Sequence, residues 1–305
     1  MTKVSIIGSG NVGSTLAMRI AEANLADVAL YDIAADTCKG KTLDLTDAAP
    51  IAGHNRAVTA LADPSGIKDS SVVVITAGFP RMPGMSREEL LAKNASIVKD
   101  AVGGIKRHSP GAIVILVTNP LDAMTYLAYK AGGFSRNRVF GMAGDLDTAR
   151  FVVLLAEAAG VPYADIETYV LGSHGDTMVP VLSHTKIKGR SVYDVLSKGQ
   201  IEDIVARTMK RGAEIVNLLK AGSAYYAPSA AVFGMVKAVI NDTNAISCVS
   251  CVLDGEYGLK DICIGVPASL GKDGIGSIKQ LSLNEREIAQ LKMSAEAIRK
   301  TLGTV

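Results

Sequence analysis

Short runs of β-branched and other apolar residues alternate with helix-like stretches through the first half of the chain, and no other feature restricts the fold as strongly. The runs read KVSII, VALYD, VVVIT and AIVILV. They lack the alternation of apolar and polar residues that is typical of a strand with one wet face, so we expect both faces of each strand to be buried. This predicts an α/β fold, in which helices cover both faces of a doubly wound parallel sheet.

The rhythm changes beyond about residue 144. Longer helices are predicted near 145–159, 200–220, 228–240 and 284–302, with antiparallel-looking strands near 165–171, 246–253 and 261–270. We therefore expect a first domain over residues 1–144 and a second, α+β domain over residues 145–305. No Pro/Ser-rich linker separates them, so the two parts should pack closely.

Composition and charge limit the possible partners. Charged residues make up 20% of the 305 residues and the formal net charge is +2, with no long run of like charges, so we expect no nucleic-acid partner. The longest apolar runs, such as 113–117, fall far short of the roughly 18 residues that a membrane helix needs, so we expect no membrane span. The chain starts directly with a strand-like pattern and no cleavable leader, which predicts a cytoplasmic protein.

Cys248 and Cys251 form the pattern CVSC, which also occurs in redox and metal sites. The surrounding segment AISCVSCVLDGEYG reads as a strand, in which residues of opposite parity point to opposite faces. We therefore interpret both residues as packing cysteines whose thiols diverge, and we expect no metal site.

A glycine-rich turn follows the first predicted strand and opens an apolar helix. Asp32 ends the next strand, 19 residues past the last glycine of the turn, where a carboxylate can accept hydrogen bonds from both ribose hydroxyls. The alternative, a glycine turn and an unrelated surface Asp, needs two coincidences in the right order. The arrangement predicts a Rossmann-type dinucleotide-binding domain. The residues of the turn are Gly8, Ser9, Gly10, Asn11, Val12 and Gly13.

Asp32 also indicates which dinucleotide binds, because a carboxylate repels a 2′-phosphate and no Lys or Arg follows until Lys39. NAD is therefore favoured over NADP. Val117, Thr118 and Asn119 close the strand AIVILV at the carboxyl edge of the predicted sheet, where ligands of doubly wound folds bind. Asn119 can reach the nicotinamide side there, or can simply belong to an Asn-Pro turn that ends the strand.

One of the four histidines stands out. His174 lies in LGSHGDTMVP, between small residues at a predicted strand end, where an imidazole can face a ligand without crowding. The others have the sequence environment of ordinary surface residues; they are His54, His108 and His184.

Two groups of charged residues are candidates for binding an acidic substrate. Asp147 and Arg150 lie three residues apart on a predicted helix and so share one face, where they could also form a plain salt bridge. Arg81 and Arg87 lie in a predicted loop, which could equally be a solvated basic loop.

Together these segments resemble the lactate/malate dehydrogenase family over essentially the whole chain. The resemblance implies an enzyme that oxidises a 2-hydroxyacid by hydride transfer to NAD, and an assembly that is a homodimer or homotetramer. The matching stretches, in the family's order, are GSGNVG, YD, TAGFPRMPGMSR, NP, DLDTAR, GSHGDTMVP, SAYYAP and LDGEYG.

The resemblance also implies roles for individual residues. His174 would take the hydroxyl proton of the substrate, with Asp147 fixing its tautomer. Arg150 would bind the C1 carboxylate as a bidentate fork. Arg87, on a mobile loop, would polarise the C2 oxygen when that loop shuts, and Asn119 would hydrogen-bond the same oxygen.

Two further positions refine this expectation. Arg81 stands where lactate-specific relatives carry a neutral Gln, so the resemblance implies a dicarboxylic substrate, malate or oxaloacetate. Asn94 matches a family residue near the cofactor. The alternatives that stay open are a lactate or other 2-hydroxyacid dehydrogenase on the same scaffold, and a dinucleotide-binding protein without turnover.

Three positions depart from the family's usual pattern. Asp145 stands where the family usually has an apolar residue, and it adds a second carboxylate close to Asp147. Ser173 replaces a more usual Gly before the histidine, and Phe79 is bulkier than the usual small residue. We expect the last two to be tolerated.

Overall fold

A parallel sheet forms the first half of the computed structural model, which describes residues 2–79 and 87–303. Its strands stand in the order β3-β2-β1-β4-β5-β6, and each is parallel to its neighbours. The predicted doubly wound parallel sheet is therefore confirmed. The strands are β1 (Lys3–Ile7), β2 (Asp27–Tyr31), β3 (Val58–Ala60), β4 (Val72–Ile75), β5 (Ile113–Leu116) and β6 (Val139–Met142).

Successive residues of these strands enter different hydrophobic cores. Val72 and Val74 pack in the cluster that contains Leu16 of α1. Val73, between them, packs in the cluster that contains Val98 of α3. Both faces of the sheet are buried, as the lack of alternation in the sequence predicts. The covering helices of this half are α1 (Asn11–Glu22), α2 (Ala35–Ala52), α3 (Arg87–His108) and α4 (Leu121–Gly132).

The sheet does not stop at the expected division near residue 144. Strand β12 (Ala245–Asp254) pairs antiparallel with β6, with Val249 opposite Met142, so across the described residues one 11-stranded sheet runs through both halves. The sequence predicts close packing of the halves but not this shared sheet, because strand partners distant in sequence leave no local signal. The remaining strands of this sheet are β13 (Lys260–Gly271), β14 (Gly274–Ile278), β8 (Val170–Gly172) and β9 (Met178–Pro180).

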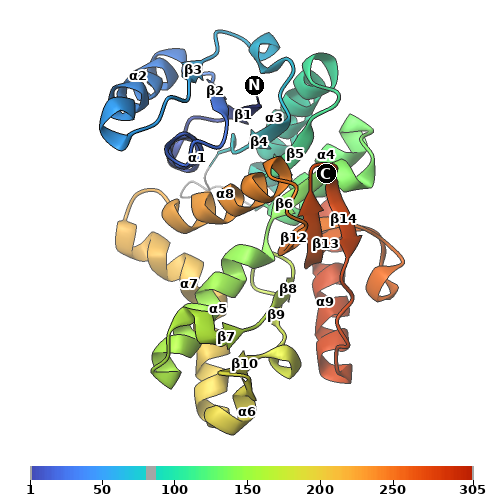
Figure 1. Cartoon of the computed structure of the whole chain (residues 1–305). Coiled ribbons are helices and arrows are strands. Elements are labelled where there is room, and N and C mark those ends of the chain that lie inside the picture. Colours follow the sequence, from blue (N-terminus) through green and yellow to red (C-terminus); the bar gives the residue numbers. More distant parts are fainter. Residues whose placement is uncertain (1, 80–86, 304–305) are drawn as a thin grey trace.

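The second half adds further helices, among them α7, which has 22 residues like α3 of the first half, and a small three-stranded sheet (Figure 1). Helix α8 lies beside α1 of the first half, and α9 begins with a capping box in which Asn284 and Glu287 bond each other's main chain. The helices are α5 (Gly144–Ala159), α6 (Val192–Val195), α7 (Lys198–Leu219), α8 (Tyr226–Ile240) and α9 (Glu285–Leu302). The small sheet contains β7 (Ile166–Glu167), β10 (Lys186–Ile187) and β11 (Arg190–Ser191). Short 3₁₀ helices cover Pro64–Ile67, Arg136–Arg138, Tyr163–Asp165, Leu182–His184 and Glu256–Gly258.

Three expectations about single residues and segments can be compared with the fold. Cys248 and Cys251 are buried, unpaired thiols on β12, as expected of packing residues. His54 is only 5% exposed, so its interpretation as a surface residue is wrong; its Nδ1 accepts a hydrogen bond from the Arg56 N–H, a loop contact without a sequence signature. Within residues 2–79 and 87–303, no helix is both long and apolar enough to cross a membrane.

Candidate active site

The glycine-rich turn passes from β1 into α1, and at Gly8 and Gly13 its backbone leaves no room for a side chain. Gly8 has a φ of +109°, and a Cβ added there would lie 2.5 Å from the Ala77 nitrogen. A Cβ at Gly13 would collide with the Gly8 carbonyl oxygen. At Gly10, no atom of the described residues lies within 4 Å of an added Cβ. The helix N-terminus therefore faces open space, which fits a pyrophosphate held by main-chain N–H groups.

Asp32 follows β2 directly and binds the same turn. One carboxylate oxygen accepts from the Ser9 N–H at 2.6 Å and from the Ser9 hydroxyl at 3.0 Å, and the other accepts from the Ala34 N–H at 3.0 Å. Burial acts to raise the pKa of Asp32, but these hydrogen bonds and the charge of Lys41 outweigh it and hold the pKa below its ordinary value. The carboxylate at this end of the crevice is therefore ionised at neutral pH.

Side chains at the carboxyl edge of the sheet tie neighbouring strand ends together. Thr118 is buried and donates to the Ala77 carbonyl at 2.6 Å. Asn94 on α3 is 1% exposed; its amide accepts from the Phe79 N–H at 2.8 Å and donates to the Asn119 carbonyl at 2.7 Å. Asn94 thus joins the chain that follows β4 to the chain that follows β5. Val117 is buried beside Thr118, whereas Asn119 is exposed.

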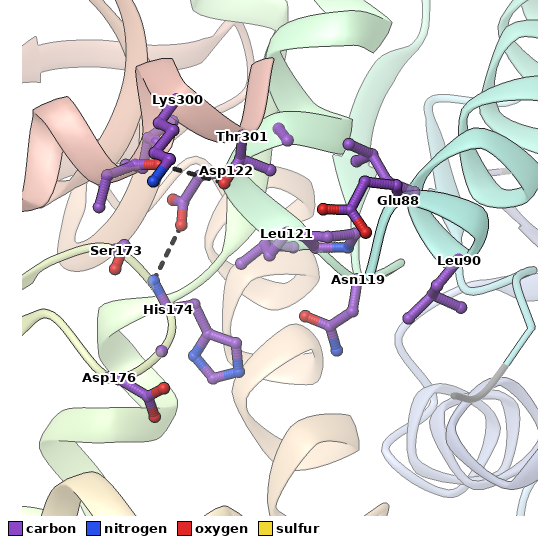
Figure 2. A pocket seen from close by; sticks show the side chains of 16 residues that line it. Glu88, Leu90, Asn119, Leu121, Asp122, Ser173, His174, Asp176, Lys300 and Thr301 are labelled. Carbon is purple, nitrogen blue, oxygen red and sulfur yellow. Dashed lines mark hydrogen bonds between the residues drawn. The ribbon is translucent and has the colours of Figure 1, made fainter. Parts of the chain in front are cut away.

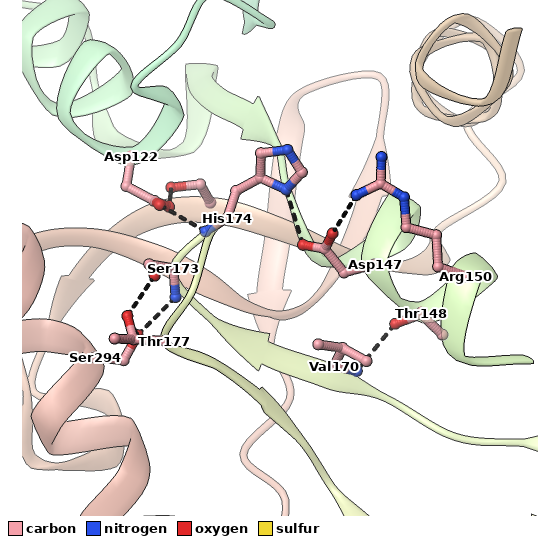
Figure 3. A network of polar contacts seen from close by, with 10 residues as sticks. Asp122, Asp147, Thr148, Arg150, Val170, Ser173, His174, Thr177 and Ser294 are labelled. Carbon is pink, nitrogen blue, oxygen red and sulfur yellow. Dashed lines mark hydrogen bonds and ion pairs between the residues drawn. The ribbon is translucent and has the colours of Figure 1, made fainter. Parts of the chain in front are cut away.

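His174, Asp147 and Arg150, which are separated along the chain, form one hydrogen-bonded line (Figure 3). Asp147 lies in the first turn of α5 and is 1% exposed, with one carboxylate oxygen 2.8 Å from His174 Nδ1. Its other oxygen lies 3.3 Å from Nη1 of Arg150, three residues further along the helix. His174 follows β8, whose end brings the imidazole to the N-terminus of α5. The three predicted residues are therefore brought together.

The charges around His174 decide its protonation. Burial acts to lower the pKa of His174, but the Asp147 carboxylate, through its charge and its hydrogen bond, and the charge of Asp122 raise the pKa above the ordinary value. Because Nδ1 bonds Asp147, Nε2 is the nitrogen available for proton exchange. Figure 2 shows the His174 ring and the Asn119 amide directed into the same space.

Asp122 is a part of the site that sequence reasoning missed. It is 5% exposed in the first turn of α4, accepts from the His174 main-chain N–H at 2.9 Å and accepts from the Ser250 hydroxyl at 2.7 Å. Burial raises the pKa of Asp122 to about 6. Its only local signal is an acidic residue three positions after Asn119, at a predicted helix start; the partners come from β12 and from the turn after β8.

The residues that depart from the family's pattern each contact other side chains or main-chain groups of the described residues. The Ser173 hydroxyl lies 2.7 Å from Oγ1 of Thr177, and the Ser173 N–H donates to Ser294 Oγ at 2.7 Å, so this serine braces the turn that carries His174. The partly buried Asp145 carboxylate accepts from the Cys248 N–H of β12 at 2.6 Å. Phe79 is half-exposed, with the Lys93 ammonium 5.7 Å from its ring centroid.

The Arg150 guanidinium has an N–H donor that no described residue accepts. Its side chain is 13% exposed, and its Nε is buried without a hydrogen-bond partner in the part of the chain that the structure describes. A Cβ added to Gly212 of α7 would lie 3.6 Å from its Nη1, so a glycine lets this helix pass close beside the guanidinium. A partly buried guanidinium with an unpaired N–H donor is suited to a carboxylate ligand.

A cavity of about 650 Å³ is lined by His174, whereas Asp147 and Arg150 are not among its lining residues (Figure 2). It lies between the start of α3, the start of α4, the turn after β8 and the end of α9. Arg81 lies outside the described residues, and Arg87 begins α3 with a side chain that is likewise not described. Polar residues that line the cavity are Glu88, Asn119, Asp122, Ser173, His174, Asp176, Lys300 and Thr301.

Family models match both halves of the chain. Residues 2–141 match the lactate/malate dehydrogenase NAD binding domain, and residues 144–305 match the lactate/malate dehydrogenase alpha/beta C-terminal domain. The chain belongs to the lactate/malate dehydrogenase family. The expected Rossmann-type fold and NAD cofactor are confirmed by these matches.

Similar proteins carry both names of the family. A malate dehydrogenase of Roseiflexus sp. (strain RS-1) is 49% identical over 303 residues, which cover 99% of this chain and 98% of the relative. The malate dehydrogenase structure from Salinibacter ruber has a TM-score of 0.94 at 42% identity and covers 99% of this chain and 97% of its own. A Cryptosporidium parvum lactate dehydrogenase complexed with lactic acid and nicotinamide adenine dinucleotide has a TM-score of 0.96 at 37% identity. The match covers 99% of this chain and 97% of that chain. Overall fold therefore does not separate the two substrates.

Proposed function

We propose that this chain is an NAD-dependent malate dehydrogenase that oxidises (S)-malate reversibly to oxaloacetate, with His174 as the proton acceptor. The observation that carries the mechanism is the hydrogen-bonded line His174–Asp147–Arg150, whose central carboxylate is buried, beside the carboxyl edge of the NAD-binding sheet. Relatives of nearly the same length, at 46–49% identity, are named malate dehydrogenase, which supports the activity.

His174 and Asp147 would move and steady the proton. The Asp147 carboxylate accepts from Nδ1–H, which leaves Nε2 unprotonated and able to take the proton of the C2 hydroxyl. The imidazolium that results is stabilised by the same carboxylate, 2.8 Å away. In the reverse direction the imidazolium protonates the developing alkoxide of the reduced oxaloacetate.

The remaining polar groups would orient the acid. Arg150 offers its unpaired donors to the C1 carboxylate, and Asn119 offers its amide to the C2 oxygen. Arg87 would polarise that oxygen from the start of α3. Arg81 would pair with the second carboxylate of malate or oxaloacetate, which is the basis for preferring these acids over lactate and pyruvate.

The cofactor would extend along the crevice from α1 to the carboxyl edge of β5. Asp32 would accept from the adenosine ribose, and the turn over residues 8–13 would hold the pyrophosphate. Val117, Thr118 and Asn119 would line the nicotinamide end, with Asn94 acting through its bonds to the main chain of Phe79 and Asn119. When bound, NAD supplies the hydride acceptor.

We also propose a homodimer or homotetramer in the cytoplasm. Large apolar side chains are exposed on three helices: Ile51 of α2 is 92% exposed, Leu218 of α7 is 73% exposed and Tyr226 of α8 is 66% exposed. Such side chains are typical of surfaces that another subunit covers. The four free cysteines are consistent with a reducing compartment. Light scattering after size exclusion gives the subunit number.

The direct test compares oxaloacetate with pyruvate, and NADH with NADPH, by the loss of nicotinamide absorbance at fixed pH and salt. We expect oxaloacetate with NADH to be the best pair in kcat/KM. A preference for pyruvate would identify the lactate-specific alternative. No oxaloacetate-dependent loss of absorbance, despite NADH binding, would favour a binding protein without turnover.

A further inference from the structure

Side chains from three helices hold the turn that carries His174 (Figure 3). Strand β8 ends just before this turn, and the next two main-chain N–H groups donate to side chains. The Ser173 N–H donates to Ser294 Oγ of α9 at 2.7 Å. The His174 N–H donates to the Asp122 carboxylate of α4 at 2.9 Å, while its ring bonds Asp147 of α5. The place of the imidazole therefore depends on the main chain of His174 as well as on its ring.

Asp122 joins the two halves of the molecule at this point. It lies in the first turn of α4, in the first half, and is 5% exposed. One carboxylate oxygen accepts from the His174 N–H, and the other accepts from the Ser250 hydroxyl at 2.7 Å. Ser250 is buried on β12, where it stands between Gly141 of β6 and Gly265 of β13. Both carboxylate oxygens are therefore fixed by groups of the second half.

We propose that Asp122 is a positioning residue, which holds the His174 imidazole in place relative to the Asn119 amide. Asn119 lies three residues before Asp122 in the first half, and its amide and the His174 ring are directed into one space (Figure 2). The inference rests on the proposed function, because both groups would contact the C2 hydroxyl of malate. A reacting group that is displaced by about 1 Å can lose about 10² in rate. The bond from Asp122 would prevent such a displacement.

The decisive experiment compares two substitutions at this position. Asp122→Asn removes the charge but keeps an oxygen for the His174 N–H and a polar group beside Ser250. Asp122→Ala removes both contacts. We expect kcat for malate oxidation, measured above the pH midpoint of each protein, to fall at least about tenfold in Asp122→Ala and less than about threefold in Asp122→Asn. The affinity for NADH, measured by fluorescence, should stay within about twofold in both.

The pH profile separates the effect of position from that of charge. The charge of Asp122 acts with that of Asp147 to raise the pKa of His174, and the charge of Arg150 opposes them. Both substitutions remove the Asp122 charge, so the midpoint of the kcat/KM profile for malate oxidation should move to lower pH by a similar amount in both. A difference in kcat between two variants with the same midpoint then reports the position of His174.

Asp145 provides a matched control. It lies in the first turn of α5 and also accepts from a main-chain N–H, that of Cys248 on β12, at 2.6 Å. Asp145→Ala removes an equivalent bond away from His174, so kcat should stay within about threefold of the parent. Equal losses of kcat in Asp122→Ala and Asp145→Ala, or in Asp122→Ala and Asp122→Asn, would overturn the proposal.

Ser250→Ala gives a second, milder test, because it removes one contact of Asp122 and leaves its charge. We expect kcat to fall by about threefold or more with little change of the pH midpoint. If Asp122→Ala lacks a cooperative thermal transition, this variant decides the question. A kcat within about twofold of the parent in Ser250→Ala would then refute the positioning role.

Hydrogen exchange tests the same contact without turnover. Exchange of the His174 main-chain N–H, followed by mass spectrometry of peptides that cover residues 173–177, should be faster in Asp122→Ala than in Asp122→Asn. If the parent reduces neither oxaloacetate nor pyruvate, the proposed function fails, and this comparison still shows whether Asp122 holds the turn. An unchanged exchange rate in Asp122→Ala would refute the anchoring contact even in an active enzyme.

Discussion

The two ends of the proposed crevice are assembled from very different lengths of chain. At the nucleotide end, Ser9 and Asp32 are 23 residues apart, and one strand-helix-strand unit holds both. At the catalytic end, His174 binds Asp122, 52 residues away, and Asp122 binds Ser250, 128 residues further along. The first is a property of a contiguous motif, whereas the second exists only because one sheet continues through both halves of the molecule.

The two ends also differ in the direction in which their surroundings shift the pKa values of their titratable groups. Asp32 is partly exposed, and its hydrogen bonds hold its pKa below the ordinary value. At the catalytic end, burial raises the pKa of Asp122 to about 6, and the neighbouring carboxylates raise the pKa of His174. The nucleotide end keeps a fixed charge, while the catalytic end holds groups that exchange a proton near neutral pH.

The substitution with the largest expected effect acts on the catalytic end alone. His174→Asn removes the proton carrier, which typically contributes about 10² to 10⁴ in rate, so kcat for oxaloacetate reduction should fall by that factor. The nucleotide end should be unaffected, and NADH affinity measured by fluorescence should stay within about twofold. Retention of more than about a tenth of the parent kcat would show that another group is the base.

Arg81→Gln tests the substrate assignment, and its expected effect is the next largest. With pyruvate, Arg81 would be enclosed without a partner, and an unpaired buried charge costs roughly 3 to 5 kcal/mol. We expect oxaloacetate reduction to fall at least about a hundredfold in kcat/KM, while pyruvate reduction stays level or rises. An oxaloacetate-to-pyruvate ratio within about threefold of the parent would remove Arg81 as the selector.

The same contrast explains what the sequence could predict. The buried parallel strands, the glycine turn and the Asp32 position follow from local patterns, and the fold and the cofactor are confirmed. Local patterns make His174, Asp147 and Arg150 candidates, but only the resemblance to a family implies their roles. Asp122 was missed because its two partners come from the turn after β8 and from β12, and no local spacing encodes those contacts.

The pH dependence of kcat/KM should have opposite signs for the two directions of the reaction at the catalytic end. Malate oxidation needs neutral His174, so its kcat/KM should rise with pH and level off above the raised pKa. Oxaloacetate reduction needs the imidazolium and should fall over the same range. Asp147→Asn removes the main group that raises this pKa, so the midpoints of both profiles should move to lower pH, with a smaller loss of kcat than in His174→Asn. Unchanged midpoints would show that Asp147 does not control the titration.

The smallest effect on activity is expected at Asp145, because it lies two residues from Asp147 but bonds β12. Its carboxylate accepts from the Cys248 N–H at 2.6 Å. Burial raises the pKa of Asp145, with the Cys248 and Ser247 hydrogen bonds opposing that shift. For an acid whose pKa is higher in the folded state, the favourable contribution to stability is present below the unfolded pKa and is lost as pH rises through the folded pKa.

Asp145→Asn keeps an acceptor for the Cys248 N–H and removes the partly buried charge, so at pH 8 its melting temperature should equal or exceed that of the parent. The advantage should shrink as pH falls through the raised pKa of Asp145, because the parent carboxyl is then protonated. Asp145→Val leaves the N–H without that acceptor and should lower the free energy of unfolding by about 1–3 kcal/mol relative to Asp145→Asn. Asp145 bonds the Cys248 N–H of β12 and, among the described residues, makes no hydrogen bond or ion pair with His174, so kcat should stay within about threefold of the parent in Asp145→Asn. A tenfold or larger loss of kcat with an unchanged melting temperature would instead make Asp145 part of the proton relay.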